Sequence, residues 1–407
     1  MTRNPDITNH NEAGALMQPA SRLERLPLYF FADLGQRIQA LRDRGVDVIR
    51  LDIGSPDMPP PPHIIDALTR AAQAPDRHGY PGFHGTPALR RAIAQYYERR
   101  FGVSLSPQTE VVALLGSKEG IANMALAWLD PGDLALVPDP CYPTYEMGPR
   151  MVGAEIFRMP LLPENGFLPD LDAIPPAVAE RARLMWLNYP NNPTGAIAPM
   201  EFLERAVDFC RRHDILLCHD APYCEITFDG YRAPSVLEIP GAKDVAIEFN
   251  SFSKSYNMAG WRIGMAVGNA TAVQALARIK TNIDSGIFLP IQEAAIAALT
   301  GDQSWMEERN RIYQERRDII VDTLHAIGLE VNTPLASLYV WPRLPHGASA
   351  QEVATRWLEE AGVSVTPGTT YGEYGEGYLR ISIGAPTERV REAMERIRRL
   401  YASSNVS

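Results

Sequence analysis

A lysine follows directly after a short apolar run of the chain. Residues 245–249 have the composition of a buried strand and lead into Asn250-Ser-Phe-Ser-Lys254, which places Lys254 beside hydroxyl groups. An ammonium group is costly to bury unless it is paired or reacts. Use of the lysine as a Schiff base removes that cost. The position of Lys254 therefore favours covalent chemistry over a purely structural role.

A second segment has the pattern of a phosphate site. Residues 111–115 read as a strand, followed by Gly116-Ser-Lys-Glu-Gly120 and an apolar pattern of helical period. Backbone N–H groups at the start of a helix bind phosphate well, and Ser117 and Lys118 add two more donors. A plain strand-to-helix turn has the same pattern. Taken alone, the segment leaves both interpretations open.

Two further apolar runs end in polar residues. Residues 184–187 lead into Asn188-Tyr-Pro-Asn-Asn-Pro-Thr-Gly195, which is too rich in turn formers to be regular structure. Residues 215–218 end at His219 and Asp220. Read alone, the first segment is explained equally well by a loop with asparagine caps, and an aspartate after a strand is more often a helix cap than a catalytic acid.

The elements that position these residues alternate between helix and strand from about residue 85 to 270. The expected strands are 111–115, 134–137, 184–187, 215–218 and 245–249. Strands separated by helices imply crossover connections, and hence a mainly parallel sheet that helices cover on both faces. Ligands on such sheets bind beyond the carboxyl ends of the strands. The polar segments are therefore expected to meet at one edge of the sheet.

The two ends of the chain read differently. Residues 23–46 have helical periodicity, 48–53 read as a short strand, and the prolines at 59–62 predict a stiff linker with a helix from near His63. From about residue 305 a long charged helix, apolar runs at 337–341 and 378–383, and further helices give an α+β pattern. We expect an α/β fold with an N-terminal arm (1–30), a large domain (56–299) and a smaller α+β domain (31–55 and 300–407).

Composition excludes several classes of protein. The 407 residues are 45% hydrophobic and 22% charged, as in ordinary globular proteins, which argues against disorder. The net charge of −10 argues against binding to nucleic acid or to anionic membranes, because both require concentrated positive charge.

The cysteines and the first residues bear on location. Cys141, Cys210, Cys218 and Cys224 form no CxxC pair and no zinc-ligand spacing, so we expect no metal site and buried thiols in a reducing compartment. Residues 1–20 are polar and lack the apolar segment of a signal peptide, and no apolar run is long enough to span a bilayer. We expect a cytoplasmic protein.

Three of these motifs occur together in one known family. Asn192-Pro-Thr-Gly195, Asp220 with Tyr223 three residues on, and Ser251-x-x-Lys254 with Arg262 eight residues beyond resemble the fold-type-I aminotransferases in order and interval. The resemblance covers most of the chain. It implies a pyridoxal 5'-phosphate enzyme, a homodimer with shared active sites, that moves an amino group between an L-amino acid and a 2-oxo acid.

The resemblance also implies roles for the cofactor residues. Lys254 resembles the lysine that forms the Schiff base and then acts as a base at the substrate Cα, and Asp220 the carboxylate that keeps the pyridine nitrogen protonated. Tyr223 and Asn192 would hydrogen-bond the phenolic oxygen of the cofactor, and Tyr142 would stack on its ring. The implied phosphate ligands are Ser117, Lys118, Ser251, Ser253 and Arg262.

Substrate contacts follow from the same resemblance. Arg380, in Tyr378-Leu-Arg-Ile-Ser382, resembles the arginine that binds the substrate α-carboxylate, to which Gly54 and Asn192 would add contacts. Tyr80, in Gly79-Tyr-Pro-Gly82, resembles a tyrosine that reaches the cofactor phosphate of the neighbouring subunit.

Within the family, Gly116-Ser-Lys-Glu-Gly120, Leu136-Val-Pro-Asp-Pro140 and Asn282-Ile-Asp-Ser-Gly286 are most similar to LL-diaminopimelate aminotransferases, which use 2-oxoglutarate. As aligned, those enzymes have a glutamate shortly after the tyrosine at position 80, where this chain has Phe83 and His84. Without that carboxylate a distal ammonium lacks its counter-charge, so specificity for neutral or aromatic amino acids is the alternative. The two residues equally suit a dimer interface.

Two other classes of protein are rivals. A cyclase, lyase or amino-acid oxidase of the same fold would share the cofactor residues. A non-catalytic regulator would have a degraded site or an added DNA-binding segment, and the sequence shows neither.

Overall fold

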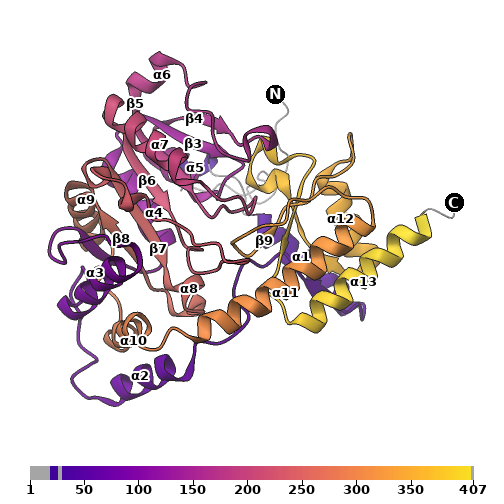
Figure 1. The fold of residues 1–407 in the computed structure, drawn as a ribbon, viewed down its shortest axis with the longest axis horizontal. Helices are drawn as coiled ribbons and strands as arrows, with labels where there is room; N and C mark the ends of the chain where they lie inside the picture. Colours follow the sequence, from indigo (N-terminus) through magenta and orange to yellow (C-terminus); the bar gives the residue numbers. More distant parts are fainter. Residues whose placement is uncertain (1–18, 26–29, 405–407) are drawn as a thin grey trace, which may run out of the picture.

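A seven-stranded sheet forms the centre of the computed structural model, which describes residues 19–25 and 30–404 (Figure 1). Its strand order is β2-β8-β7-β6-β5-β3-β4. The strands are β2 (Val111–Leu114), β3 (Leu134–Asp139), β4 (Glu155–Pro160), β5 (Ala182–Asn188), β6 (Leu216–Asp220), β7 (Ala246–Ser251) and β8 (Gly264–Gly268). All are parallel except β8, which runs antiparallel to both of its neighbours.

The expected mainly parallel sheet is confirmed, and each of the five expected strands has a counterpart. Strands β4 and β8 were not predicted. β4 lies at the sheet edge, is largely only half buried and carries Glu155 and Arg158, so it lacks the apolar run of a central strand. β8 has only three residues between Gly264 and Gly268.

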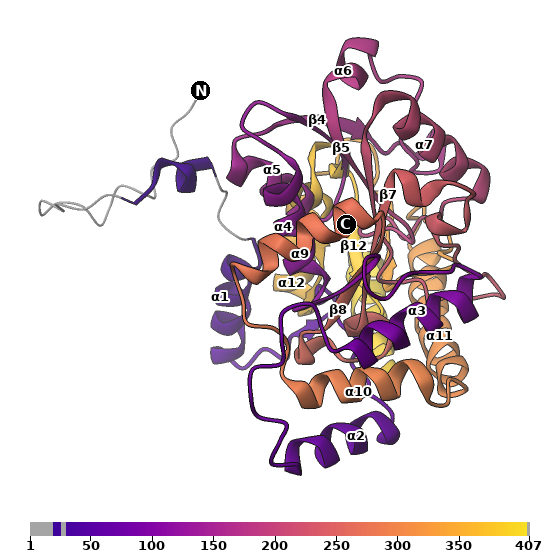
Figure 2. The same cartoon turned by 90° about the vertical axis from the view of Figure 1, so that its left-hand side faces the viewer.

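Helices cover both faces of this sheet (Figure 2). Successive strand residues point to opposite faces: Val112 and Leu114 pack toward one helical layer, and Val111 and Ala113 toward the other. The first layer consists of α4 (Ser117–Trp128), α5 (Thr144–Val152) and α9 (Ala270–Thr281). The second consists of α3 (Pro87–Phe101), α7 (Met200–His213) and α10 (Leu289–Thr300), with α2 (Pro62–Gln73) packed on α10.

A separate hydrophobic cluster, the second core, lies beside the sheet. Its helices include α11 (Trp305–Ala326), α12 (Ala350–Ala361) and α13 (Thr387–Ser404), and α1 (Phe30–Asp43) packs nearby on α12. Its strands are β9 (Tyr339–Val340), β11 (Thr366–Pro367) and β12 (Leu379–Ser382) in an antiparallel sheet, and the parallel pair β1 (Ile49–Arg50) and β10 (Val363–Ser364). The strand expected at 48–53 is therefore only two residues long.

Short helical turns complete the chain. They are α6 (Pro176–Arg181), α8 (Phe252–Ser255) and the 3₁₀ turns Ser21–Arg25, Pro163–Asn165, Val236–Glu238, Ala242–Asp244, Ala259–Trp261, Gly368–Tyr371 and Glu373–Gly375. The linker before α2 is extended at Pro61, as expected of proline.

The division into domains stays a prediction. The seven-stranded sheet and the smaller sheets pack on different hydrophobic clusters, but Tyr223, Ile226 and Phe228 pack into the second core although they lie within the expected large domain. Most of the expected N-terminal arm lies outside the described residues. None of the helices within residues 19–25 and 30–404 combines the length and the apolar character that a bilayer crossing requires.

Candidate active site

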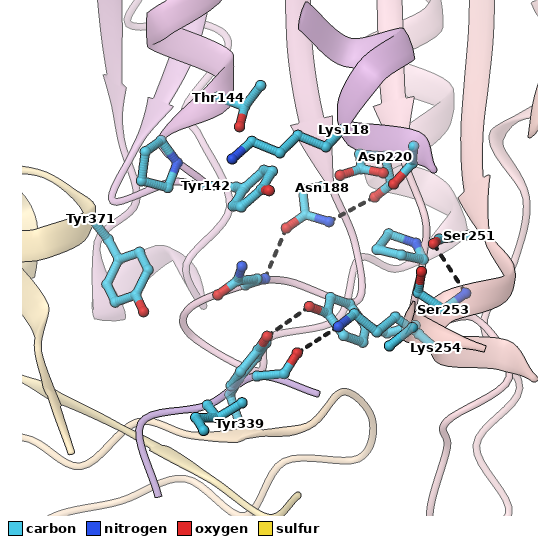
Figure 3. Close-up of a pocket in the computed structure, with 18 of the residues that line it drawn as sticks. Lys118, Tyr142, Thr144, Asn188, Asp220, Ser251, Ser253, Lys254, Tyr339 and Tyr371 are labelled. Atoms are coloured by element: carbon cyan, nitrogen blue, oxygen red, sulfur yellow. Dashed lines mark hydrogen bonds between the residues drawn. The ribbon is translucent and has the colours of Figure 1, made fainter. Parts of the chain in front are cut away.

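A cavity of about 420 Å³ lies where the carboxyl ends of the parallel strands meet the second core. Figure 3 shows Asp220, Ser251, Ser253 and Lys254 on the side of the sheet, and Tyr339 and Tyr371 on the side of the second core. The cavity is lined by every sequence-predicted site residue except Tyr80: Gly54, Ser117, Lys118, Tyr142, Asn192, Asp220, Tyr223, Ser251, Ser253, Lys254, Arg262 and Arg380.

Lys254 lies in α8, directly after β7. Its Nζ donates a hydrogen bond to the carbonyl oxygen of Gly54 at 2.5 Å. Burial, followed by the positive charges of Arg380 and Arg262, lowers the pKa of Lys254 to about 8. The lowered pKa therefore increases the share of the neutral amine near neutral pH, which is the form that attacks a carbonyl carbon.

Asp220 is the last residue of β6 and is almost fully buried. Its Oδ2 accepts a hydrogen bond from the hydroxyl of Tyr145 at 2.6 Å, whereas its Oδ1 is buried and has no partner within the described chain. Burial raises the pKa of Asp220 to about 7, against the opposing effect of the Tyr145 hydrogen bond. Because a buried carboxylate oxygen without a donor is unfavourable, the ring N–H of pyridoxal phosphate fits this position chemically.

The expected phosphate ligands converge on the start of α4. Gly116, the N-cap residue, has a φ of +79°, and a Cβ there would lie 2.2 Å from Nη2 of Arg262. Nη1 of Arg262 donates to Oγ of Ser253 at 3.4 Å, and Oγ of Ser251 accepts from the backbone N–H of Ser253 at 3.2 Å. A guanidinium, hydroxyl groups and helix N–H groups are the donors that a phosphate group prefers.

Arg380 reaches the cavity from β12. Its Nη1 donates to Oδ1 of Asn192 at 3.0 Å and its Nη2 to the carbonyl oxygen of Asp52 at 2.7 Å. The guanidinium carbon lies 4.3 Å from the ring centre of Tyr339 and 4.8 Å from that of Tyr371. Contacts with both rings hold the planar fork in one orientation, which suits the binding of a carboxylate.

The loop at residues 188–195 is held in place by Asn188. Oδ1 of Asn188 accepts from the backbone N–H of Asn192 at 2.8 Å, and its Nδ2 donates to the carbonyl oxygen of Asp220 at 2.7 Å. The hydroxyl of Tyr223 pairs with that of Tyr339 at 2.8 Å. Asn192 and Tyr223 therefore each have a neighbour at the cavity, and their contacts with the cofactor stay predictions.

Sequence reasoning missed seven polar residues of this cavity: Arg50, Asp52, Thr144, Tyr145, Asn188, Tyr339 and Tyr371. Tyr145 follows the predicted Tyr142 by three residues, close to one helical turn. Asn188 ends the predicted strand, so both positions carried a usable signal. Tyr339 and Tyr371 carried none, because only the tertiary fold brings them to the sheet.

Tyr80, Phe83 and His84 lie between α2 and α3 and do not line the cavity. Tyr80 is 91% exposed and Phe83 is 45% exposed. Their side chains make no contribution to the site of their own chain.

Comparison with known proteins agrees with this geometry. Residues 46–397 match the family described as aminotransferase class I and II. The chain is 54% identical over 384 residues to the LL-diaminopimelate aminotransferase of Moorella thermoacetica, covering 94% of this chain and 98% of that protein. It is 55% identical over 379 residues to the enzyme of that name from Desulforudis audaxviator, covering 93% and 97%.

Among solved structures, substrate-bound BacF from Bacillus subtilis has a TM-score of 0.91 and 41% identity, covering 95% of this chain and 98% of that one. The family match spans most of the chain, and the relatives share half of its residues. The chain therefore belongs to the class I and II aminotransferases and is a fold-type-I, pyridoxal-phosphate-dependent aminotransferase.

Proposed function

We propose that the cavity residues act in the roles that the sequence predicts. Pyridoxal phosphate, when bound, supplies a carbonyl group and an electron-accepting ring. Lys254 would hold the cofactor covalently, and its Nζ would be the base for the proton of the substrate Cα. The observation that carries the proposal is the unpartnered Oδ1 of Asp220 in the same cavity as Lys254 and Arg262.

Arg380 is the proposed ligand of the substrate α-carboxylate. The carbonyl oxygen of Asp52, Oδ1 of Asn192 and the two tyrosine rings already orient its guanidinium, so little conformational entropy is lost on binding. Holding the carboxylate at a set place keeps the Cα–H bond directed at Lys254.

Gly116→Ala is expected to weaken cofactor binding about tenfold or more, because the new Cβ displaces Arg262 from the phosphate site. Equilibrium titration of the apoenzyme with pyridoxal phosphate measures the effect. Gly132→Ala is the matched control, since Gly132 has a φ of +90° and open space around it. Equal losses of affinity in the two variants would show that backbone strain, rather than Arg262, is responsible.

The proposed amino donor is LL-diaminopimelate and the proposed acceptor is 2-oxoglutarate. The relatives of highest identity reported above carry the donor in their names. Phe83 and His84, in place of the expected glutamate, favour the alternative of a neutral or aromatic amino acid. Phe83 and His84 can contact the substrate only if they reach the active site of a second copy of this chain.

A screen of amino donors tests the substrate. The enzyme is mixed with LL-diaminopimelate or with phenylalanine, and the loss of the visible absorbance of the lysine-bound cofactor is followed, as is its return on adding 2-oxoglutarate. If LL-diaminopimelate is the donor, as the names of the relatives propose, its kcat/KM is expected to exceed that for phenylalanine about 100-fold or more. The reverse order would establish the alternative. Consumption of the donor without return of the absorbance would indicate cyclase, lyase or oxidase chemistry.

A homodimer is part of the proposal. Tyr80 and Phe83 belong to a segment that packs on residues near Gly286, where the exposed Ile283 and Phe288 add apolar surface. An exposed apolar patch of this kind is typical of a protein interface. A molecular mass of 45.1 kDa in solution, that of one chain, would contradict the dimer.

The proposed location is the cytoplasm. All four cysteines are buried free thiols, which suits a reducing compartment. Cell fractionation with an antibody to the protein tests this location.

A further inference from the structure

Tyr145 is the one residue of α5 that donates a side-chain hydrogen bond to Asp220. The tyrosine is fully buried, and its ring stacks on Trp186 with centres 4.9 Å apart and planes 13° apart. The edge of a further ring, that of Tyr142, packs against it at 5.7 Å. Because the rings of Trp186 and Tyr142 pack against the Tyr145 ring, the ring has little freedom, and its hydroxyl stays directed at Oδ2 of Asp220.

Among the groups around Asp220, the Tyr145 hydroxyl stabilises the ionised carboxylate most. Burial disfavours the charged form most strongly, and the Tyr145 hydrogen bond is the largest opposing effect on its pKa. Further groups act on the carboxylate from the neighbouring elements: His219 of β6, Glu248 of β7, Lys254 of α8 and Tyr223. His219 and Glu248 bond to each other at 2.9 Å.

We propose that Tyr145 is a positioning residue that keeps the Asp220 carboxylate ionised and aimed, and so sets the lowest pH at which the apoenzyme binds its cofactor tightly. The inference rests on the proposed function, in which Asp220 pairs with the ring nitrogen. Oδ2 is held by Tyr145, which leaves Oδ1 as the acceptor for that nitrogen.

The tyrosine remains a donor throughout the neutral range. Burial and the Asp220 charge raise the pKa of Tyr145 above its ordinary value, so its hydroxyl keeps its proton. Without that hydroxyl, both oxygens of Asp220 would be buried without a donor, and the pKa of the carboxylate would rise above about 7.

The sign of the pH dependence follows from this arrangement. Binding of the ring N–H requires the ionised carboxylate, so cofactor affinity is present above the pKa of Asp220 and is lost as the pH falls through it. Since the pKa of Asp220 in the protein without cofactor is about 7, the affinity of the wild-type apoenzyme is expected to fall below about pH 7.

Tyr145→Phe tests the inference. Titration of the apoenzyme with pyridoxal phosphate from about pH 6 to 9 is expected to show the fall in affinity displaced upward by roughly one to two pH units, with a loss of roughly 5- to 50-fold at pH 7. If the cofactor affinity of Tyr145→Phe falls at the same pH as that of the wild type, the proposed role of Tyr145 is wrong.

A matched control removes a different buried tyrosine hydroxyl. Tyr96 is buried, and its hydroxyl donates to the carboxylate of Glu225, away from the cavity. Tyr96→Phe is expected to leave unchanged the pH at which cofactor affinity falls. If it shifts the fall as much as Tyr145→Phe does, general loosening of the core is the cause, and the inference fails.

A double-mutant cycle separates this inference from the proposed function. In Asp220→Asn the pH-dependent fall assigned to Asp220 should be absent, and adding Tyr145→Phe should have little further effect. An undiminished effect of Tyr145→Phe in that background would overturn the inference. If Asp220→Asn alone leaves affinity unchanged, the proposed role of Asp220 is what fails.

Circular dichroism of each apo variant shows that it is folded. Should Tyr145→Phe not fold, Tyr145→His tests the inference from the opposite side, because it removes the hydroxyl but retains a ring N–H donor near Asp220. That variant is expected to bind the cofactor with no upward displacement of the pH dependence, and an upward displacement would contradict the role of the hydrogen bond.

Discussion

Lys254→Ala is expected to abolish covalent attachment of pyridoxal phosphate and to lower kcat by at least about a thousandfold, because both the nucleophile and the base at Cα are lost. The chain has only four lysines, of which Lys254 and Lys118 line the cavity. Borohydride reduction of the wild-type enzyme, digestion and mass spectrometry of the peptides identify the modified lysine. In the variant, the modified peptide should be absent.

Lys243→Ala is the matched control for Lys254. Lys243 lies outside the cavity and pairs with Glu110 at 3.1 Å, so its loss should leave both labelling and turnover unchanged. Attachment of the cofactor to Lys118 in the wild-type enzyme, or normal turnover of Lys254→Ala, would contradict the central assignment.

Arg380→Ala is expected to lower kcat/KM roughly 30-fold to several thousandfold for every amino acid, equivalent to about 2 to 5 kcal/mol. All substrates share the α-carboxylate, so the loss should be similar for LL-diaminopimelate, for phenylalanine and for the 2-oxo acids. The variant is also expected to leave Tyr339 and Tyr371 without the cation between them. Steady-state kinetics with several donors measure the effect.

Two further variants distinguish geometry from charge. Arg380→Lys retains the positive charge but not the planar fork, and should recover only part of the activity. Arg205→Ala, which removes an exposed arginine of α7 paired with Asp172, should have no effect. A loss in Arg380→Ala that is confined to one donor would mean that Arg380 binds the side chain of the substrate instead.

The positions that could be predicted from sequence are those governed by the strand-end rule. Asp220 and Ser251 end parallel strands, and Ser117 opens the helix after another, so the pattern of strands alone brought them to one edge. Their proposed role as cofactor ligands came from the joint spacing of the motifs. The fold class followed from the same alternation of strands and helices.

The remainder depends on contacts between distant segments. Strand β8 is short and flanked by glycines, so it has no local signal, yet it lies between β2 and β7. Tyr339 and Tyr371 join the site only because the second core packs against the sheet. Tyr80 and Phe83 are exposed and lie outside the site of their own chain, so their predicted role depends on a second chain.

The place of β8 has a consequence for the order of folding. Strand β2 has no neighbour in the sheet other than β8, which is made long after it during synthesis. Gly116 follows β2 and Arg262 precedes β8, so the proposed phosphate site forms only when this last strand inserts antiparallel between its partners. Strand pairings so distant in sequence form slowly. A ligand that binds only the complete site stabilises the state in which β8 has inserted. Adding the cofactor during refolding should therefore raise the yield of folded enzyme, because it binds and stabilises the chain once β8 has inserted.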